Sequence, residues 1–162
     1  MAGVDYFLKI DGIQGESKAD KHKDEMDLLS FSWGATQSGT FAFGGGGGAG
    51  KVSMQDFHFT MLDNKASPAL FLACAQGDHL KTATLTCRKA GKEQQEFLKV
   101  TMSDCLVSSF QTGGSSGGDQ IPTDQISLNF AKIEWEYKEQ DNTGKLMGST
   151  KKWFDLKSVK GG

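Results

Sequence analysis

Alternating hydrophobic and polar residues run through most of this chain and predict a protein built mainly of β-strands. In segment 4–10 every second residue is hydrophobic, and Asp5 and Lys9 stand between them. A period of two is typical of a strand with one buried and one solvated face. The same kind of pattern predicts eight strands in all, the other seven at 28–37, 52–61, 82–89, 96–102, 105–112, 125–137 and 151–157.

The strand predicted at 28–37 permits an assignment of faces. Leu29, Phe31 and Trp33 share one parity and are expected to face the core. Ser30 and Ser32 have the opposite parity, so their side chains are expected to point away from the core. This strand therefore presents small hydroxyl groups on its outer face.

In the strand predicted at 52–61 the apolar residues change parity near 55–56, which indicates a bulge or a sharp bend. Beyond the bend, Phe57 and Phe59 share a face. His58 lies between them and is expected to point to the opposite side.

One helix is predicted among the strands. Ser67 is a residue type that caps helices, Pro68 suits a first turn, and Gly77 suits a C-terminal stop. These signals predict a short helix over 69–76 whose apolar stripe packs on the sheets. Segment 11–27 carries acids and lysines of both signs and is expected to be a solvated loop.

The longest predicted strand, 125–137, changes faces midway. Its apolar residues keep one parity up to Phe130 and take the other from Ile133 onward. A strand of this kind suits a barrel or two crossed sheets that share it. We therefore expect a single domain over residues 1–162, mainly β: a compact antiparallel β-barrel of two packed sheets with one flanking α-helix.

Composition and charge argue against several classes of function. The 162 residues carry a formal net charge of −2, and Arg88 is the only arginine. Proteins that read nucleic acids usually present bidentate arginines on a basic face, so nucleic-acid binding is not expected. The longest uncharged apolar run, 69–75, is far shorter than the roughly 20 residues of a membrane helix, so membrane insertion is not expected.

A glycine tract raises the question of nucleotide binding. Residues 45–51 match the first seven positions of a P-loop, but Val52 stands where serine or threonine would hold magnesium. The residues after Lys51 predict a strand instead of the helix whose N-terminus would hold phosphate. Nucleotide binding is therefore not expected.

Side chains that carry catalysis or bind metals are scattered along the chain. The cysteines are odd in number and widely spaced, and are expected to be small buried side chains: Cys74, Cys87 and Cys105. The three histidines are equally far apart. We therefore expect no enzymatic activity, no metal and no cofactor.

The segment 39–50, GTFAFGGGGGAG, combines two phenylalanines with the glycine tract. Phe41 and Phe43 lie outside the alternating strands, and exposed phenylalanines on a monomer usually mark a contact. They indicate a contact with another molecule or a lid over the fold. A plain flexible linker is the alternative.

Six segments, in order along the chain, resemble the haemolysin-coregulated protein (Hcp) family, which forms the tube of bacterial type VI secretion systems. They are DYFLKIDGIQGES (5–17), LSFSWGATQSG (29–39), GGGGGAGKVSMQDFHFT (44–60), KASPALFLACAQG (65–77), VSSFQTGG (107–114) and LNFAKIEWEY (128–137). The resemblance covers most of the chain, and residues 139–162 carry little of it.

The resemblance implies a head-to-tail homohexameric ring with a wide pore. Rings would stack into a tube inside a contractile sheath, below a spike protein, with effector proteins in the pore. The ring-stacking loop would comprise Phe41, Phe43, Gly44, Gly45, Gly46, Gly47, Gly48 and Gly50. Ser32 and Ser115 would line the pore and contact effectors.

The implied route out of the cell agrees with the N-terminal residues. Asp5 and Lys9 interrupt the stretch that would be apolar in a signal peptide. We therefore expect a cytoplasmic protein that is secreted by the type VI system after assembly, without a signal peptide.

Two other interpretations stay open. A small-ligand-binding β-barrel or lectin-like module would need a deep apolar cavity in the monomer. An enzyme would need a converging acid and base, which the spacing of the residues does not suggest.

Overall fold

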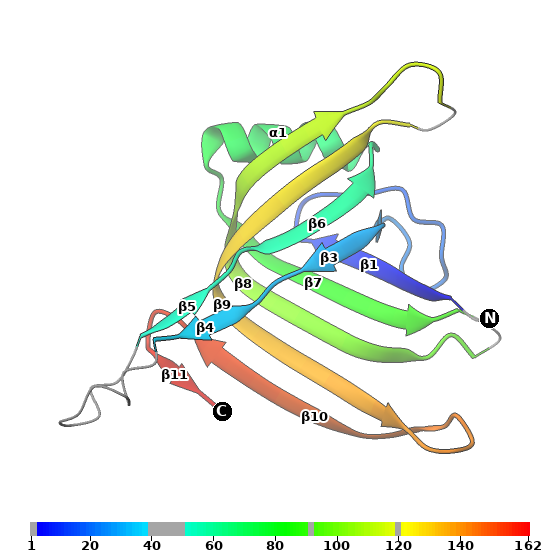
Figure 1. Ribbon diagram of the computed structural model, residues 1–162, viewed down its shortest axis with the longest axis vertical. Helices are drawn as coiled ribbons and strands as arrows, with labels where there is room; N and C mark the ends of the chain where they lie inside the picture. The colour runs from blue at the N-terminus through cyan, green and yellow to red at the C-terminus, as the bar shows by residue number, and fades with distance from the viewer. Residues whose placement is uncertain (1–2, 39–50, 91–92, 119–120) are drawn as a thin grey trace.

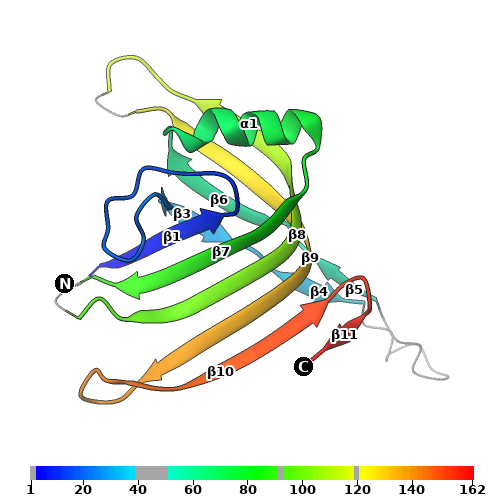
Figure 2. The ribbon, with the colours of Figure 1, turned by 180° about the vertical axis from the view of Figure 1, so that it is seen from behind.

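The computed structural model describes residues 3–38, 51–90, 93–118 and 121–162. In these ranges the protein has eleven strands and one helix, drawn in Figures 1 and 2. The elements are β1 (Val4–Ile10), β2 (Met26–Leu28), β3 (Ser30–Ser32), β4 (Ala35–Gln37), β5 (Val52–Met54), β6 (Phe57–Leu62), α1 (Ala66–Gln76), β7 (Leu80–Lys89), β8 (Glu96–Gly113), β9 (Thr123–Gln140), β10 (Leu146–Asp155) and β11 (Lys160–Gly161).

The strands form two layers that share two long strands. The main path runs β11-β10-β9-β8-β7-β1-β2, while β6 and then β3 branch from β9, and β4 and β5 form a separate ribbon. The first half of β9 pairs with β6 and its second half pairs with β10. Both β8 and β9 have 18 residues, long enough to pass from one layer into the other (Figure 2).

In both β8 and β9 the buried side chains switch from one face of the strand to the other, and the two switches lie next to each other. Met102 and Cys105 of β8 are both buried although they are three residues apart, and the same holds for Phe130 and Ile133 of β9. Asp104 has a φ of 54°, a conformation that interrupts regular strand alternation. The change of faces predicted for the longest strand is confirmed, and it marks the corner where the two layers share strands.

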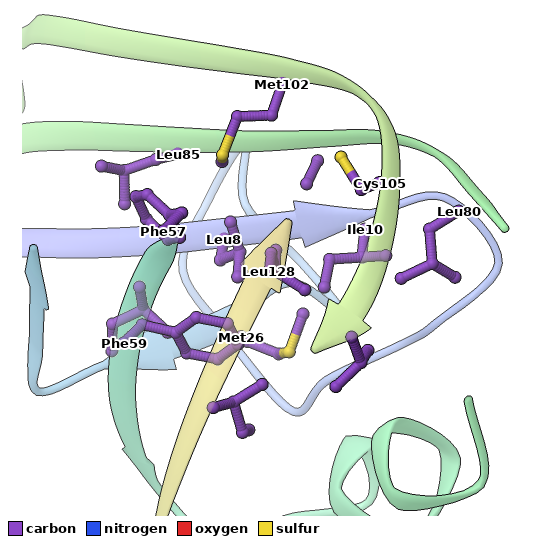
Figure 3. Close-up of a cluster of buried hydrophobic side chains, with 14 of the residues drawn as sticks. Leu8, Ile10, Met26, Phe57, Phe59, Leu80, Leu85, Met102, Cys105 and Leu128 are labelled. Carbon is purple, nitrogen blue, oxygen red and sulfur yellow. The ribbon is translucent and has the colours of Figure 1, made fainter. Parts of the chain in front are cut away.

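The core lies between the two layers and is filled by large apolar side chains. Figure 3 shows Leu8 of β1, Met26 of β2, Leu128 of β9, and both Phe57 and Phe59 of β6 converging there. Each of the five is 0% exposed. Burial of each such side chain stabilises the fold by about 1.5–3 kcal/mol, so this cluster fixes how the layers pack.

The expected closed barrel is not formed. In the described chain, β3 pairs only with β6, and β8 beyond Cys105 pairs only with β9. Within the described residues no strand joins these two edges: the chain enters β3 from β2 of the other layer, and β8 ends at Gly113. The prediction of a mainly β protein with two layers and one flanking helix is confirmed. The prediction that the sheets close into a barrel is wrong.

The predicted strand at 28–37 is interrupted. β2 pairs with β1 and β3 pairs with β6, so the chain crosses between layers at Leu29. Leu29 is therefore 55% exposed, contrary to its predicted place in the core. Phe31 and Trp33 pack against the core as predicted.

The helix begins at Ala66, three residues before its predicted start. The Ala66 amide donates to Asn64 Oδ1 at 2.8 Å, so Asn64 and not Ser67 accepts from the first amide of the helix. Ser67 Oγ instead accepts the backbone N–H of Asn64 at 3.0 Å. Ser67 lies in the first turn, and its hydroxyl donates to the buried Asp124 carboxylate at 2.5 Å. Gly77 ends the helix with a φ of 66°, as predicted.

The segment predicted as a solvated loop at 11–27 is anchored to the sheet. His22 is only 5% exposed, and its ring stacks on Phe7 with centroids 4.4 Å apart. Its Nδ1 lies 3.0 Å from a Glu25 oxygen and its Nε2 lies 2.6 Å from Glu96 Oε1 on β8. The contacts of His22 therefore hold this loop in place, a role that local composition could not reveal.

Candidate functional site

Ser32 lies on the outer side of a sheet whose inner side covers the core. This four-strand sheet consists of β3, β6, the first half of β9 and the second half of β8, in that order. We call its outer side the polar face. The face forms because successive side chains of a strand alternate between the core and solvent.

Eight polar residues, none of them an acid, a lysine or an arginine, make up two rows across the polar face. In the order β3, β6, β9 and β8 they are Ser32, His58, Ser127 and Ser109, then Ser30, Thr60, Gln125 and Gln111. The core-facing residues between these rows are large and apolar. The surface is thus dense in hydrogen-bonding groups, and five of these eight residues are serine or threonine.

Hydrogen bonds between neighbouring strands order this face. Ser30 Oγ lies 2.6 Å from Thr60 Oγ1, and His58 Nδ1 lies 3.1 Å from Ser127 Oγ. His58 points away from the core, as predicted from its place between two phenylalanines. These contacts hold the side chains in position.

The carboxylate of Asp56, held by two hydrogen bonds, lies beside the two rows. Asp56 accepts hydrogen bonds from Ser108 Oγ at 2.6 Å and from Asn129 Nδ2 at 3.0 Å. It lies in the break between β5 and β6, where the sequence predicts a bend. Both carboxylate oxygens of Asp56 therefore have partners within the protein.

The two residues assigned to a pore occupy different parts of the surface. Ser32 is exposed within a row of the polar face. Ser115 lies two residues beyond the end of β8 and is also exposed. A cleft of about 570 Å³ lies at the β8 end of the sheet, where Gln111, Thr123 and Gln125 contribute to its lining.

The residues assigned to ring stacking lie in 39–50, outside the described residues. These are Phe41, Phe43, Gly44, Gly45, Gly46, Gly47, Gly48 and Gly50. The segment is flanked by β4 and β5, which pair antiparallel with Ala35 opposite Met54. Lys51 is followed by strand β5, as predicted from the residues after the glycine tract.

The polar face as a surface was not predicted from the sequence. The parity of Ser32 and of His58 could each be derived locally, and both are confirmed. Their pairing with each other, and with Ser127, depends on strands that are far apart in the chain. The sequence does contain a local sign of the same face in 125–130, where polar residues alternate with buried apolar ones.

Other kinds of site find little support in the described ranges. No group of three or more histidine, cysteine or acidic side chains is arranged there to hold a metal ion. No helix within those ranges combines the length and the apolar content that crossing a membrane requires.

Comparison with known proteins agrees with this fold. The family model described as "Type VI secretion system effector, Hcp" matches residues 7–137. Protein hcp1 of Pseudomonas aeruginosa is 47% identical over 151 residues, which are 93% of each chain. A solved structure of a type six secretion system protein superposes with a TM-score of 0.93 at 31% identity, covering 99% of this chain and 100% of that one. Hcp1 from Salmonella typhimurium has a TM-score of 0.81 at 34% identity, covering 98% and 99%. This chain belongs to the Hcp family of type VI secretion proteins.

Proposed function

We propose that this chain is the structural subunit of a type VI secretion tube, in which six copies form a head-to-tail ring and rings stack. Family membership is the observation that carries this proposal. The open four-strand sheet supports it, since it has one edge at β3 and a different edge at β8. Head-to-tail contacts join two different surfaces and close into a ring when the rotation per subunit fits.

We further propose that the polar face, with Ser32, and the loop at Ser115 line the pore and hold effector proteins. Small polar side chains suit this task because a carrier must release its cargo. Interfaces anchored by tryptophan, tyrosine or arginine hold their partners most strongly, and tight complexes dissociate slowly. A spike protein at the tip and a contractile sheath outside complete the proposed set of partners.

Light scattering on the purified chain tests the ring. Six chains of 17.5 kDa give a particle of about 105 kDa. A mass of one chain at micromolar concentration would contradict the proposed ring. In that case the apolar cleft beside Phe31, Trp33 and Trp135, about 490 Å³ in volume, would favour the small-ligand module, and ligand screening should follow.

Recovery of a cognate effector with the tagged ring tests the cargo surface. Ser32→Gln and Ser115→Gln should keep the ring mass and lower the amount of effector recovered, because each adds bulk to the proposed wall. Ser149→Gln on β10 is the matched control, since it is an exposed strand serine away from the polar face. Unchanged recovery with both pore variants would remove these residues from the cargo surface.

The ring-stacking loop can be separated from the ring itself. Phe41→Ala combined with Phe43→Ala should leave the mass of single rings unchanged and reduce their stacking into tubes. Electron microscopy of concentrated protein measures the stacking. Loss of the single ring would instead assign both phenylalanines to contacts within the ring.

A further inference from the structure

The loop that joins β1 to β2, drawn in blue in Figure 2, covers a second and smaller buried site. We call residues 15–25 of this loop the strap. Phe7 of β1 stacks on a strap residue and is 2% exposed, although strand alternation turns it away from the core that contains Leu8. Thr86, which pairs with Phe7 across to β7, is buried as well. The strap therefore shields a patch on the outer side of the sheet.

His22 is the strap residue that contacts this patch. Its ring lies parallel to the Phe7 ring, with an interplanar angle of 2°. Nδ1 lies 3.0 Å from each carboxylate oxygen of Glu25, and Nε2 lies 2.6 Å from Glu96 Oε1. Glu25 belongs to the strap and Glu96 belongs to β8, so the Nε2 contact ties the strap to the sheet.

Both ring nitrogens of His22 thus face a group that only accepts hydrogen bonds. An ionised carboxylate has no hydrogen to donate. A neutral imidazole carries one N–H group and one lone pair, so it can donate to only one of the two carboxylates. The imidazolium ion carries N–H groups at both nitrogens and can donate to Glu25 and Glu96 together. The arrangement is therefore complete only when both nitrogens of His22 are protonated.

Charged groups of β1 and β7 also face this site. The Arg88 guanidinium of β7 lies over the Phe7 ring, 4.7 Å from its centroid, and donates to the Asp20 carbonyl oxygen of the strap at 3.1 Å. Asp5 Oδ2 of β1 lies 3.7 Å from Arg88 Nε. Arginine is not deprotonated in proteins, so the Arg88 contact with the strap is present at every pH near neutrality.

The other charged residues near the site are an acid of β2 and three strap residues. Burial, and after it the Asp5 charge, raises the pKa of Asp27 from its ordinary value near 4, so its change of charge falls in the acid range. The strap residues beside His22 are not buried: Lys21, Lys23 and Asp24. Histidine is the residue type whose charge usually changes between about pH 5 and 8. A change of pH near neutrality therefore acts here on His22.

We propose that the strap is a pH-sensitive switch that His22 holds on the sheet in its doubly protonated form. When the pH rises and the ring loses one proton, a nitrogen lone pair faces a carboxylate oxygen of Glu25 or Glu96. That contact changes from attractive to repulsive, the strap is released, and Phe7 becomes accessible. The strap is thus attached at the lower pH and released at the higher pH. The switch lies within one chain, so it goes beyond the proposed tube function and does not depend on ring formation.

Replacing one carboxylate by an amide should remove the pH dependence. The Glu96→Gln side chain offers both an acceptor oxygen and N–H donors. It can accept from the imidazolium ion, and after rotation of the amide it can donate to the lone pair of the neutral ring. The strap of this variant should therefore stay attached whether or not His22 carries its second proton.

Proteolysis of the strap between about pH 6 and pH 9 tests the switch. A lysine-specific protease cleaves after Lys18, Lys21 or Lys23 once the strap is released, and mass spectrometry measures the rate. The ratio of the wild-type rate to the Glu96→Gln rate at the same pH cancels the pH dependence of the protease itself. We expect this ratio to rise about tenfold across the range, which corresponds to about 1.4 kcal/mol.

Two control variants separate the His22 contacts from other effects of pH. Glu93→Gln makes the same chemical change at an exposed acid three residues before Glu96 and should keep the wild-type profile. His79→Ala removes a histidine that pairs with Asp104 at the surface and should also keep it. Circular dichroism at both ends of the pH range shows whether the fold persists.

Each other outcome has a defined meaning. A ratio that stays constant from pH 6 to pH 9 would overturn the switch, and so would a rise that disappears equally in the Glu93→Gln control. If Glu96→Gln is already cleaved rapidly at the low end of the range, Glu25→Gln makes the same exchange at the other ring nitrogen. A cleavage profile of Glu25→Gln that is flat relative to Glu93→Gln supports the switch, and a profile like the wild type overturns it.

Discussion

A buried carboxylate next to the start of α1 shows how single residues fix the position of the helix. Asp124 is 0% exposed, and its Oδ2 accepts the Ser67 hydroxyl at 2.5 Å. The same hydroxyl oxygen accepts the backbone N–H of Asn64 at 3.0 Å. This bridge joins β9 to the turn that begins the helix, so Ser67 acts in tertiary packing as well as locally.

Ser67→Ala should therefore lower the free energy of unfolding by about 1–3 kcal/mol, because it leaves a buried carboxylate without its hydroxyl donor. Urea denaturation measures the change. Ser116→Ala, in an exposed turn, is the control and should stay within about 0.5 kcal/mol of the wild type. Equal stabilities of the two variants would show that the bridge does not stabilise the fold.

The cysteines differ in reactivity according to burial. Burial raises the pKa of the Cys87 thiol to about 12 and, with help from the Asp104 charge, that of Cys105 to about 11. The thiolate is the reactive form, so both are essentially unreactive near pH 8. Cys74 is only partly buried.

A thiol reagent at pH 8 should accordingly modify Cys74 alone in the native protein and all three cysteines in urea. Mass spectrometry of the labelled protein gives the number and the sites. Rapid native labelling of Cys87 or Cys105 would contradict the buried positions of β7 and β8.

Among the elements, the loop before β2 is tied to a distant strand by a long-range contact. His22 connects Glu25 of its own segment to Glu96 of β8, whereas His79 pairs with Asp104 at the surface with its side chain 65% exposed. Hydrogen bonds to charged groups contribute about 1.5–3 kcal/mol, and more when they are buried than when water competes. The loop should therefore be held by His22 in particular.

His22→Ala should open this loop, raising its cleavage by a lysine-specific protease at Lys18, Lys21 or Lys23 at least tenfold, the factor that about 1.4 kcal/mol represents. His79→Ala is the matched control and should be cleaved at the wild-type rate. Equal cleavage of both variants would show that the His22 contacts do not hold the loop.

For the whole molecule, stability and assembly should be linked. Association that involves only the folded state stabilises that state by mass action. The unfolding temperature of the wild type should therefore rise with protein concentration. Calorimetry at three concentrations measures this shift. A wild-type midpoint independent of concentration would contradict folding coupled to assembly.

Much of the architecture could be predicted from local patterns. The alternation around Phe57 and Phe59, the bend near 55–56, the C-terminal stop at Gly77 and the corner in β9 are all confirmed. Each is recorded within a few residues, because strand parity and helix termination are local properties of the backbone. Family membership could also be predicted from the sequence, because six short segments in order along the chain resemble the family.

The tertiary structure alone decided which segments meet. Only the register of β3 on β6 and of β6 on β9 assembles Ser32, His58 and Ser127 into one row. Only the crossing between layers explains why Leu29 is exposed, and why the sheet stays open between β3 and β8. The physical reason is that local periodicity specifies which side of a strand is apolar, whereas its neighbour and layer follow from contacts between residues distant in the chain.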